Sequence, residues 1–251
     1  MKNIIAITLA AGLMAAAVSA EVRTSFDLAS AYVFRGVTYN DGAVFQPGIE
    51  VSGLGLPEEM GSVAVGAWAN YDIDDYGGSL TGSQFSEVDW YAFYSLPSMV
   101  DGLDVSIGYF EYTYPMSGDA STPPTVADKE LRVGLGYAVG DVGLGVTYYQ
   151  FVGGDYCGDA RIELSAGYDY AISDSVSASF GAVAGYVEPE NGDSGLADGS
   201  LSAGVSYALT DIWSLGVNGS YIAQLDDEIL PDGPGSYDVN FVGVMSLSAS
   251  F

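Results

Sequence analysis

The stretch YDVNFVGVMSLSASF, residues 237–251, alternates apolar residues with mostly small or polar ones up to the last position of the chain. Tyr237, Val239 and every second residue through Phe251 form the apolar set. This period of two is that of a β-strand with one apolar face. A final strand that ends on an aromatic residue is typical of chains inserted into the bacterial outer membrane. Phe251 is therefore a candidate signal for the barrel-assembly machinery.

The start of the chain has the organisation of a secretory signal peptide. Lys2 supplies a positive charge, residues 4–17 form a short apolar run, and Val18-Ser19-Ala20 is a small-residue cleavage site. We expect residues 1–20 to be the signal peptide, cleaved after Ala20, and residues 21–251 to be one outer-membrane domain. The predicted location is the cell outer membrane of a Gram-negative bacterium.

The composition favours a barrel in lipid over a bundle of spanning helices. Beyond the signal peptide no apolar run reaches the roughly 18 residues that a spanning helix needs. The chain is nevertheless 49% hydrophobic, with 34 glycines and 19 tyrosines, and its apolar residues are spread in alternation. Strands that face hydrocarbon on one side and a lumen on the other need this pattern. A secreted β-sandwich is the alternative.

Apolar alternation predicts an all-β fold, an antiparallel transmembrane β-barrel of about twelve strands. Connections between these strands alternate between mostly short turns and longer loops rich in Gly, Asp and Pro. Short turns are expected in the periplasm, so we expect both termini to be periplasmic. The predicted strands are 22–35, 43–52, 62–71, 85–95, 103–114, 128–138, 142–151, 160–171, 175–187, 199–208, 212–223 and 237–251.

A repeated pentapeptide supports this register. Residues 137–141, 170–174 and 207–211 share the form Tyr-Ala-aliphatic-x-Asp. Each places a tyrosine on the apolar face at the end of a strand, just before a short turn. A ring in lipid with its hydroxyl among headgroups suits this position. We expect Tyr137, Tyr170 and Tyr207 to belong to an aromatic girdle.

The same alternation assigns charged side chains to the lumen, because a basic side chain at the bilayer midplane costs about 2–4 kcal/mol. With Phe26, Leu28, Tyr32 and Phe34 outward, their neighbours point inward. These charges either brace the barrel through ion pairs or form a constriction that screens solutes. Small inward residues leave space, whereas bulky ones such as Trp68 and Tyr91 narrow the passage. The lumen candidates are Asp27, Arg35, Gln46, Glu50, Glu87, Asp89, Glu130, Arg132, Arg161 and Glu163.

Residues 30–52, SAYVFRGVTYNDGAVFQPGIEVS, carry a family resemblance. The segment resembles the start of the TorF family of outer-membrane porins, also called Gcw-chp proteins, which open with S-x-Y-x-(F/W)-R-G and then a strand carrying a Gln. Ser30, Tyr32, Phe34, Arg35-Gly36 and Gln46 match this pattern. The resemblance implies a porin but no particular solute.

Charge and residue content exclude several function classes. The net charge is −27, with 33 acidic and six basic residues, which argues against nucleic acid as a partner. The chain has no histidine, so no Ser-His or Asp-His constellation exists and we expect no enzyme activity. The loop carboxylates form a solvated acidic rim or bind divalent cations at the surface lipid, but no stretch has EF-hand spacing or the HExxH motif, and we predict neither a cofactor nor a metal site.

Two hypotheses about function remain. The first is a porin-like channel for passive or weakly selective passage of small hydrophilic solutes, neutral or cationic because inward carboxylates outnumber inward arginines. The alternative is a closed structural or surface-interaction barrel that acts through acidic extracellular loops. In both, the expected partners are the outer-membrane bilayer with its lipopolysaccharide and the barrel-assembly machinery. Only the channel adds small-molecule solutes to these partners.

Overall fold

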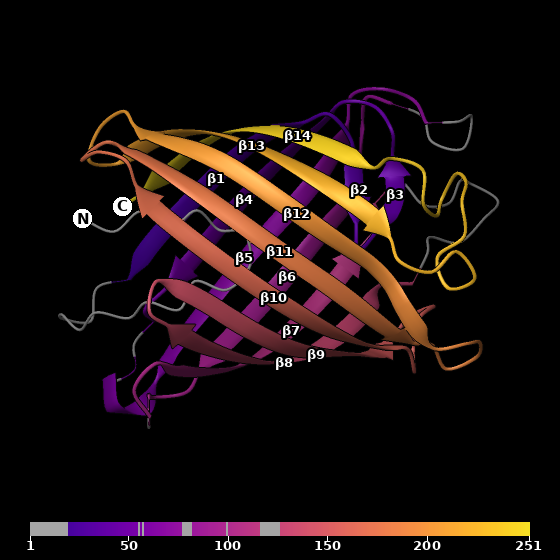
Figure 1. Cartoon of the computed structure of the whole chain (residues 1–251), viewed down its shortest axis with the longest axis horizontal. Helices are drawn as coiled ribbons and strands as arrows, with labels where there is room; N and C mark the ends of the chain where they lie inside the picture. The colour runs from indigo at the N-terminus through magenta and orange to yellow at the C-terminus, as the bar shows by residue number, and fades with distance from the viewer. Residues whose placement is uncertain (1–19, 55, 57, 77–81, 99, 116–125) are drawn as a thin grey trace.

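The computed structural model describes residues 20–54, 56, 58–76, 82–98, 100–115 and 126–251. The predicted signal peptide, apart from Ala20, lies outside these residues. The described chain forms a closed antiparallel barrel of twelve long strands and one separate two-stranded hairpin (Figure 1). The barrel strands are β1 (Glu21–Ala29), β4 (Val44–Ser52), β5 (Ser62–Asp72), β6 (Gln84–Ser95), β7 (Leu103–Thr113), β8 (Asp128–Val139), β9 (Val142–Gly153), β10 (Ala160–Ala171), β11 (Val176–Glu188), β12 (Gly195–Ala208), β13 (Trp213–Gln224) and β14 (Phe241–Ser250).

The first and last strands close the barrel. Arg23 pairs with Ser250 and Ala29 with Val244 in the register of β1 against β14. The backbone amide of Phe251 donates to the carbonyl of Val22 at 2.9 Å. Both described ends of the chain therefore lie at one end of the barrel, called the terminal end below (Figure 1). Closure leaves no strand edge unpaired, which is what lipid requires of a spanning sheet.

The faces of the strands alternate as the sequence predicts. On β8, Leu131, Val133 and Leu135 are 44–47% exposed. Glu130, the residue before Leu131, is fully buried. On β10, Ile162 and Leu164 are exposed and Arg161 and Glu163 are buried. The exposed apolar residues form the outer surface of the barrel, where they suit hydrocarbon. No helix among the described residues is long and apolar enough to cross a membrane.

The prediction of one continuous strand over residues 22–35 is wrong. The chain leaves the barrel wall after Ala29 and forms a short hairpin of β2 (Tyr32–Phe34) and β3 (Val37–Asn40). At the break, Ser30 donates its amide to the carbonyl of Gly243, and its hydroxyl accepts from the amide of Gly243. In Figure 1 the hairpin lies at the end of the barrel opposite the termini, called the hairpin end below.

The final strand is also shorter than predicted, because it begins at Phe241 rather than at residue 237. Tyr237 instead donates its hydroxyl to the carbonyl of Ile222 at 2.9 Å. It packs beside the buried cluster formed by the hairpin and the wall. The other predicted strands are confirmed with their ends shifted by a few residues.

Candidate functional site: the barrel lumen

The β2–β3 hairpin occupies the lumen because part of the inner wall is apolar. Val44, Ile222 and Val242 are buried and cluster with Tyr32 and Ala31 of the hairpin segment. Without the hairpin these wall residues would face water, at a cost of about 25 cal/mol for each Å² of apolar surface. Tyr32 and Phe34, predicted to point outward, therefore lie inside the barrel. Their outward prediction is wrong because strand parity ends where the chain leaves the wall.

Arg35 and Gly36 form the turn of the hairpin, with φ angles of 53° and 82°. Positive φ at both positions of a two-residue loop is the geometry of a type I′ hairpin turn. Glycine adopts it freely, whereas an arginine costs about 1–2 kcal/mol there. A Cβ added to Gly36 would lie 2.8 Å from the Cβ of Asp198 on β12. The hairpin thus begins at β1 and its turn reaches β12 on another part of the wall.

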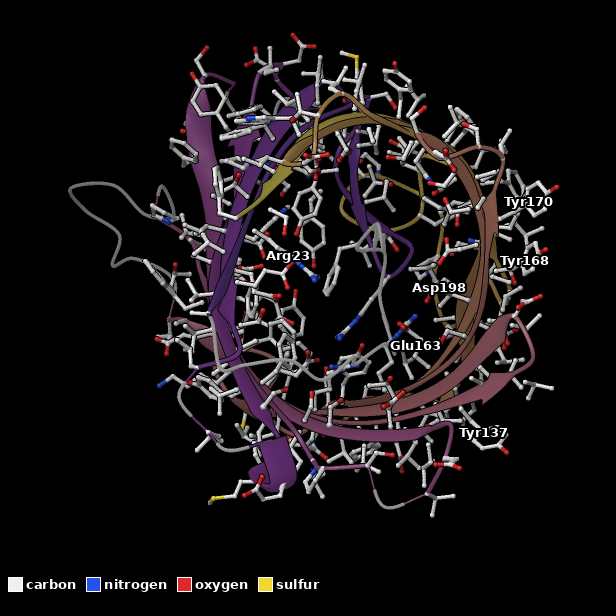
Figure 2. All side chains as sticks on the ribbon, turned by 90° about the vertical axis from the view of Figure 1, so that its left-hand side faces the viewer. Arg23, Tyr137, Glu163, Tyr168, Tyr170 and Asp198 are labelled. Carbon is white, nitrogen blue, oxygen red and sulfur yellow. The ribbon has the colours of Figure 1, made fainter. Side chains whose placement is uncertain are left out.

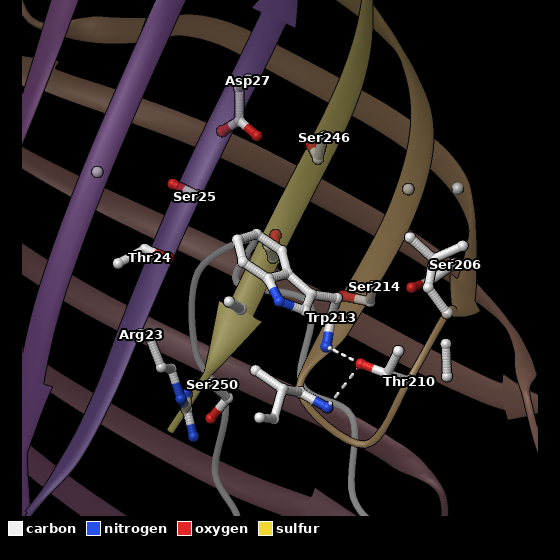
Figure 3. A pocket seen from close by; sticks show the side chains of 18 of the residues that line it. Arg23, Thr24, Ser25, Asp27, Ser206, Thr210, Trp213, Ser214, Ser246 and Ser250 are labelled. Atoms are coloured by element: carbon white, nitrogen blue, oxygen red, sulfur yellow. Dashed lines mark hydrogen bonds between the residues drawn. The ribbon is translucent and has the colours of Figure 1, made fainter.

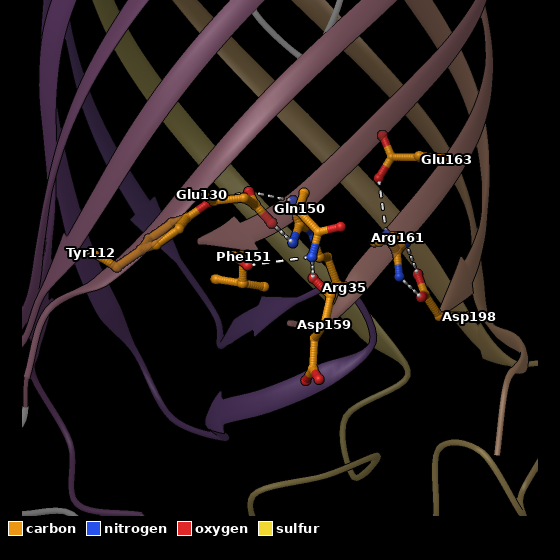
Figure 4. A network of polar contacts seen from close by, with 9 residues as sticks. All are labelled: Arg35, Tyr112, Glu130, Gln150, Phe151, Asp159, Arg161, Glu163 and Asp198. Atoms are coloured by element: carbon orange, nitrogen blue, oxygen red, sulfur yellow. Dashed lines mark hydrogen bonds and ion pairs between the residues drawn. The ribbon is translucent and has the colours of Figure 1, made fainter. Parts of the chain in front are cut away.

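Arg35 forms a buried ion pair with Glu130 of β8 (Figure 4). Its Nη1 and Nη2 donate to Oε1 and Oε2 of Glu130 at 2.6 and 3.0 Å, and Tyr112 donates its hydroxyl to Oε2 at 2.8 Å. The guanidinium also lies 4.2 Å from the ring centroid of Tyr149. Burial acts to lower the pKa of Arg35, but the hydrogen bonds and the charge of Glu130 outweigh it and raise that pKa.

Two further contacts fix the arms of the hairpin. Tyr32 donates its hydroxyl to Oε2 of Glu87 at 2.8 Å, and burial with the nearby charge of Glu87 raises the pKa of Tyr32 well above its ordinary value. Asn40 donates to Oδ1 of Asp72 at 2.8 Å, and both side chains are fully buried. These contacts bind the hairpin to β5 and β6 as well as to β8.

A second buried ion pair lies on the neighbouring wall. Arg161 on β10 donates through Nη1 and Nη2 to the two carboxylate oxygens of Asp198 at 2.6 and 3.1 Å. Its Nε lies 3.5 Å from Oε2 of Glu163. Asp198 is not among the predicted lumen residues, because the strand was predicted to begin at residue 199, whereas β12 begins at Gly195. A bulge shifts the register between Leu196 and Leu201. The apolar alternation of β12 is therefore interrupted near the start of the strand.

The terminal end of the lumen is open by contrast. A cavity of about 930 Å³, called the vestibule below, lies there (Figure 3). Arg23, Asp27, Glu50, Trp68 and Tyr91 contribute to its lining. Most of the remaining inward positions are small or carry a hydroxyl or amide group. They include Ser25, Gly48, Ser179, Gly204, Ser206, Ser214, Gly216, Asn218, Ser246, Ser248 and Ser250.

Large rings separate the vestibule from the hairpin. Tyr91, Phe93 and Phe110 contact one another with centroids 5.2–5.8 Å apart, and Phe110 stacks on Tyr112 at 5.8 Å. These rings all come from β6 and β7, so they narrow the lumen from one side. The wall of β11–β14 is lined at the vestibule level mainly by the small residues given above, with Trp213 of β13 as a large exception (Figure 3).

The remaining candidates fall on the faces that alternation assigned to them. Gln46 donates its side-chain amide to Oδ1 of Asn70 at 3.0 Å. Asp89 is buried and lies opposite Trp68 in the pairing of β5 with β6. Arg132 lies with its guanidinium carbon 5.2 Å from the ring centroid of Phe93. The girdle candidates Tyr137, Tyr170 and Tyr207 are 48–54% exposed. Figure 2 shows Tyr137 and Tyr170 outside the ring of strands, with Arg23, Glu163 and Asp198 on its inner side.

Solved structures share this fold. The NanC porin superposes with a TM-score of 0.51 at 13% identity, covering 93% of this chain and 99% of that one. An outer membrane channel from Pseudomonas putida F1 gives 0.52 at 10% identity, covering 94% and 97%. The KdgM porin gives 0.50 at 8% identity, covering 92% and 99%. The fold is therefore that of outer-membrane porins.

Sequence comparison leads to a family without an assigned activity. No curated protein is significantly similar in sequence to this chain. The family model described as "Bacterial protein of unknown function (Gcw_chp)" matches residues 14–230. This match spans most of the barrel, including the hairpin and both buried ion pairs. The chain belongs to the Gcw_chp family.

Proposed function

We propose that this protein is a porin-like channel of the outer membrane that passes small hydrophilic solutes, neutral or cationic, passively or with weak selectivity. The observation that carries this proposal is the vestibule, a lumen cavity of about 930 Å³. Many of its lining side chains are small, so they leave space for solutes. A twelve-stranded barrel is wider than an eight-stranded one, and in the eight-stranded barrel side chains are enough to fill the interior. The resemblance to TorF porins supports the same function.

The charges of the vestibule support the preference for neutral or cationic solutes. Asp27 and Glu50 face this cavity, and no ion pair is formed by either among the described residues. Arg23 is held at 2.8 Å by Glu21. These carboxylates outnumber the arginine that lines the same cavity, and an excess of carboxylate in a confined lumen attracts cations and repels anions.

The hairpin is the constriction of the proposed channel. It is anchored by the Arg35–Glu130 ion pair and by the Tyr32–Glu87 hydrogen bond, and its turn lies against Asp198. Solutes would then pass beside it along the less crowded wall. The apolar contacts and buried ion pairs keep it in place, so a small conductance is expected.

The proposed orientation places both termini in the periplasm and the hairpin end outside, facing lipopolysaccharide. The connections at the terminal end are mostly short and those at the hairpin end mostly longer, which is the asymmetry of outer-membrane barrels. Tyr137, Tyr170 and Tyr207 would lie at the periplasmic headgroup layer, and Phe251 would be read by the assembly machinery. In this proposal the protein is a transporter and not an enzyme.

Planar-bilayer recording on the purified barrel tests the channel. Ser248 lines the vestibule, whereas Leu247 beside it belongs to the outward apolar set. Ser248→Trp should lower the conductance because the ring enters the cavity, and the matched control Leu247→Trp should leave it unchanged. A wild-type barrel that is silent where control porins conduct would contradict the proposal.

One observation favours the second candidate, a closed structural or surface-interaction barrel. The hairpin buries Thr38 and Asn40 completely and reaches from β1 to β12, so it fills much of the lumen at its level. A barrel of this kind would act through its acidic loops at the hairpin end. It predicts no solute uptake by liposomes that contain the protein, and surface binding that survives deletion of the hairpin.

A further inference from the structure

Arg132 differs from the other arginines of the lumen. Arg23, Arg35 and Arg161 each hold a carboxylate at 2.6–2.8 Å. For Arg132, no ion pair and no side-chain hydrogen bond is present among the described residues. Its guanidinium rests on the ring of Phe93 instead, at 5.2 Å. An arginine supplies five donors and stays charged at every physiological pH, so this group retains its full capacity to bind an anion.

Three buried carboxylates on this side of the lumen are held by side chains other than Arg132. Glu130, two residues earlier on β8, receives both arms of Arg35 and the hydroxyl of Tyr112. Glu163 and Asp198 are both engaged by Arg161. Two arginines thus hold these three carboxylates, and none of the three forms an ion pair with Arg132. Arg132 has no carboxylate at ion-pair distance among the residues that the structure describes.

The local backbone leaves room for the guanidinium along the wall. Gly134 follows Arg132 on the same face of β8, and a Cβ there would lie 3.0 Å from Nη2 of Arg132 and 2.9 Å from the hydroxyl of Ser106. Arg132 therefore lies flat along the inner wall, against Phe93, Gly134 and Ser106. A guanidinium that is stacked on one ring keeps its edge free for a planar, bidentate partner.

The side chain of Arg132 lies next to the vestibule. Phe93, on which Arg132 rests, contacts Tyr91 with ring centroids 5.3 Å apart, and Tyr91 lines the vestibule beside Glu50. A solute in the vestibule therefore meets the carboxylates of Asp27 and Glu50 first and the guanidinium of Arg132 beyond the ring of Tyr91. Two carboxylates and one guanidinium that form no ion pair among the described residues therefore lie in sequence along one path.

We infer that Arg132 is a luminal site for the carboxylate of a small zwitterionic, amino-acid-like solute. The vestibule carboxylates favour the ammonium group of such a solute, whereas they repel a solute with only negative charge. Arg132 then binds the carboxylate through charge-assisted hydrogen bonds. This inference rests on the proposed channel function and adds the class of solute.

Swelling of liposomes that contain the full barrel tests this site, with glycine and glycerol as probes of similar size and no net charge. Arg132→Gln should lower the ratio of the glycine rate to the glycerol rate about two- to fivefold, the effect of one solvent-accessible ion pair. Arg132→Lys keeps the charge and should retain most of the ratio. Lys129→Gln removes the same charge from β8 at a position paired with Glu111 and Gly153, and should leave the ratio unchanged.

The outcomes separate the two proposals. An unchanged ratio in Arg132→Gln, with glycerol swelling intact, overturns the role of Arg132 and leaves the channel standing. An equal loss of ratio in Lys129→Gln also overturns it, because the effect would then come from net charge alone. Absence of glycerol swelling in the wild type overturns the channel and this inference together.

Discussion

The two ends of the lumen use the same kinds of polar side chain in opposite ways. At the hairpin end, carboxylates and arginines are buried and held by two or more partners, as Glu130 is by Arg35 and Tyr112. At the terminal end, the ion pair of Arg23 with Glu21 is 35–40% exposed, and serines line an open cavity. The comparison shows that a charged lumen does not by itself indicate a pore. Burial decides which charges brace the fold and which remain available to solutes.

The largest expected effect is the loss of the buried ion pair at the hairpin end. Glu130→Ala leaves the Arg35 guanidinium buried without its partner, and removal of one member of such a pair costs about 3–5 kcal/mol. We expect an equivalent drop in the free energy of unfolding, measured by urea titration of the folded barrel in lipid. Release of the hairpin should also raise the bilayer conductance. Glu130→Gln retains the shape and a hydrogen-bond acceptor and should cost less.

A smaller effect is expected from a methyl group at the hairpin turn. Gly36→Ala places a Cβ 2.7 Å from Cδ2 of Leu230 in the β13–β14 connection and 2.8 Å from the Cβ of Asp198 on β12, at a positive φ of 82°. The control Gly140→Ala has a similar φ of 62° with nothing within 4 Å. Both substitutions incur about 1–2 kcal/mol from the left-handed backbone, and only Gly36→Ala adds a clash with the far wall. Equal stability and equal conductance of the two variants would show that the hairpin does not press against β12 in solution.

The smallest effect is expected at the terminal end. Glu21→Gln breaks the Arg23–Glu21 pair, whose side chains are 35% and 40% exposed, and an exposed pair contributes about 0–1 kcal/mol. The urea midpoint should therefore move little, and less at high salt because ions screen exposed charges. A loss as large as that of Glu130→Ala would remove the distinction between the two ends.

Much of this barrel could be predicted from the sequence because its environment imposes a simple rule. Lipid outside and polar groups inside require a period of two on every strand, and this period is visible in residues such as Leu131, Arg132 and Val133. The rule also assigned Glu130, Arg161 and Glu163 to the inner face, where the structure places them. The short turns between strands follow from the same alternation.

The hairpin could not be predicted from the same rule, because both of its faces are inside the barrel. Tyr32 and Phe34 are apolar at alternate positions, so they read as a continuation of the lipid-facing set. One signal was present: Val242 and Val244 interrupt the polar face of the final strand, and an apolar patch on a lumen wall needs a cover. Alternation does not say which segment supplies that cover.

For the strands of the barrel wall, the sequence alone determined which side chains face lipid and which face the interior, since that division depends only on local strand geometry and on the cost of charge in hydrocarbon. The tertiary structure decided which interior charges neutralise one another. Arg35 and Glu130 are 95 residues apart, and Arg161 and Asp198 are 37 residues apart. Only the closed barrel and its inward hairpin bring these groups together, and this pairing leaves Arg132 without an ion pair in the part of the chain that the structure describes.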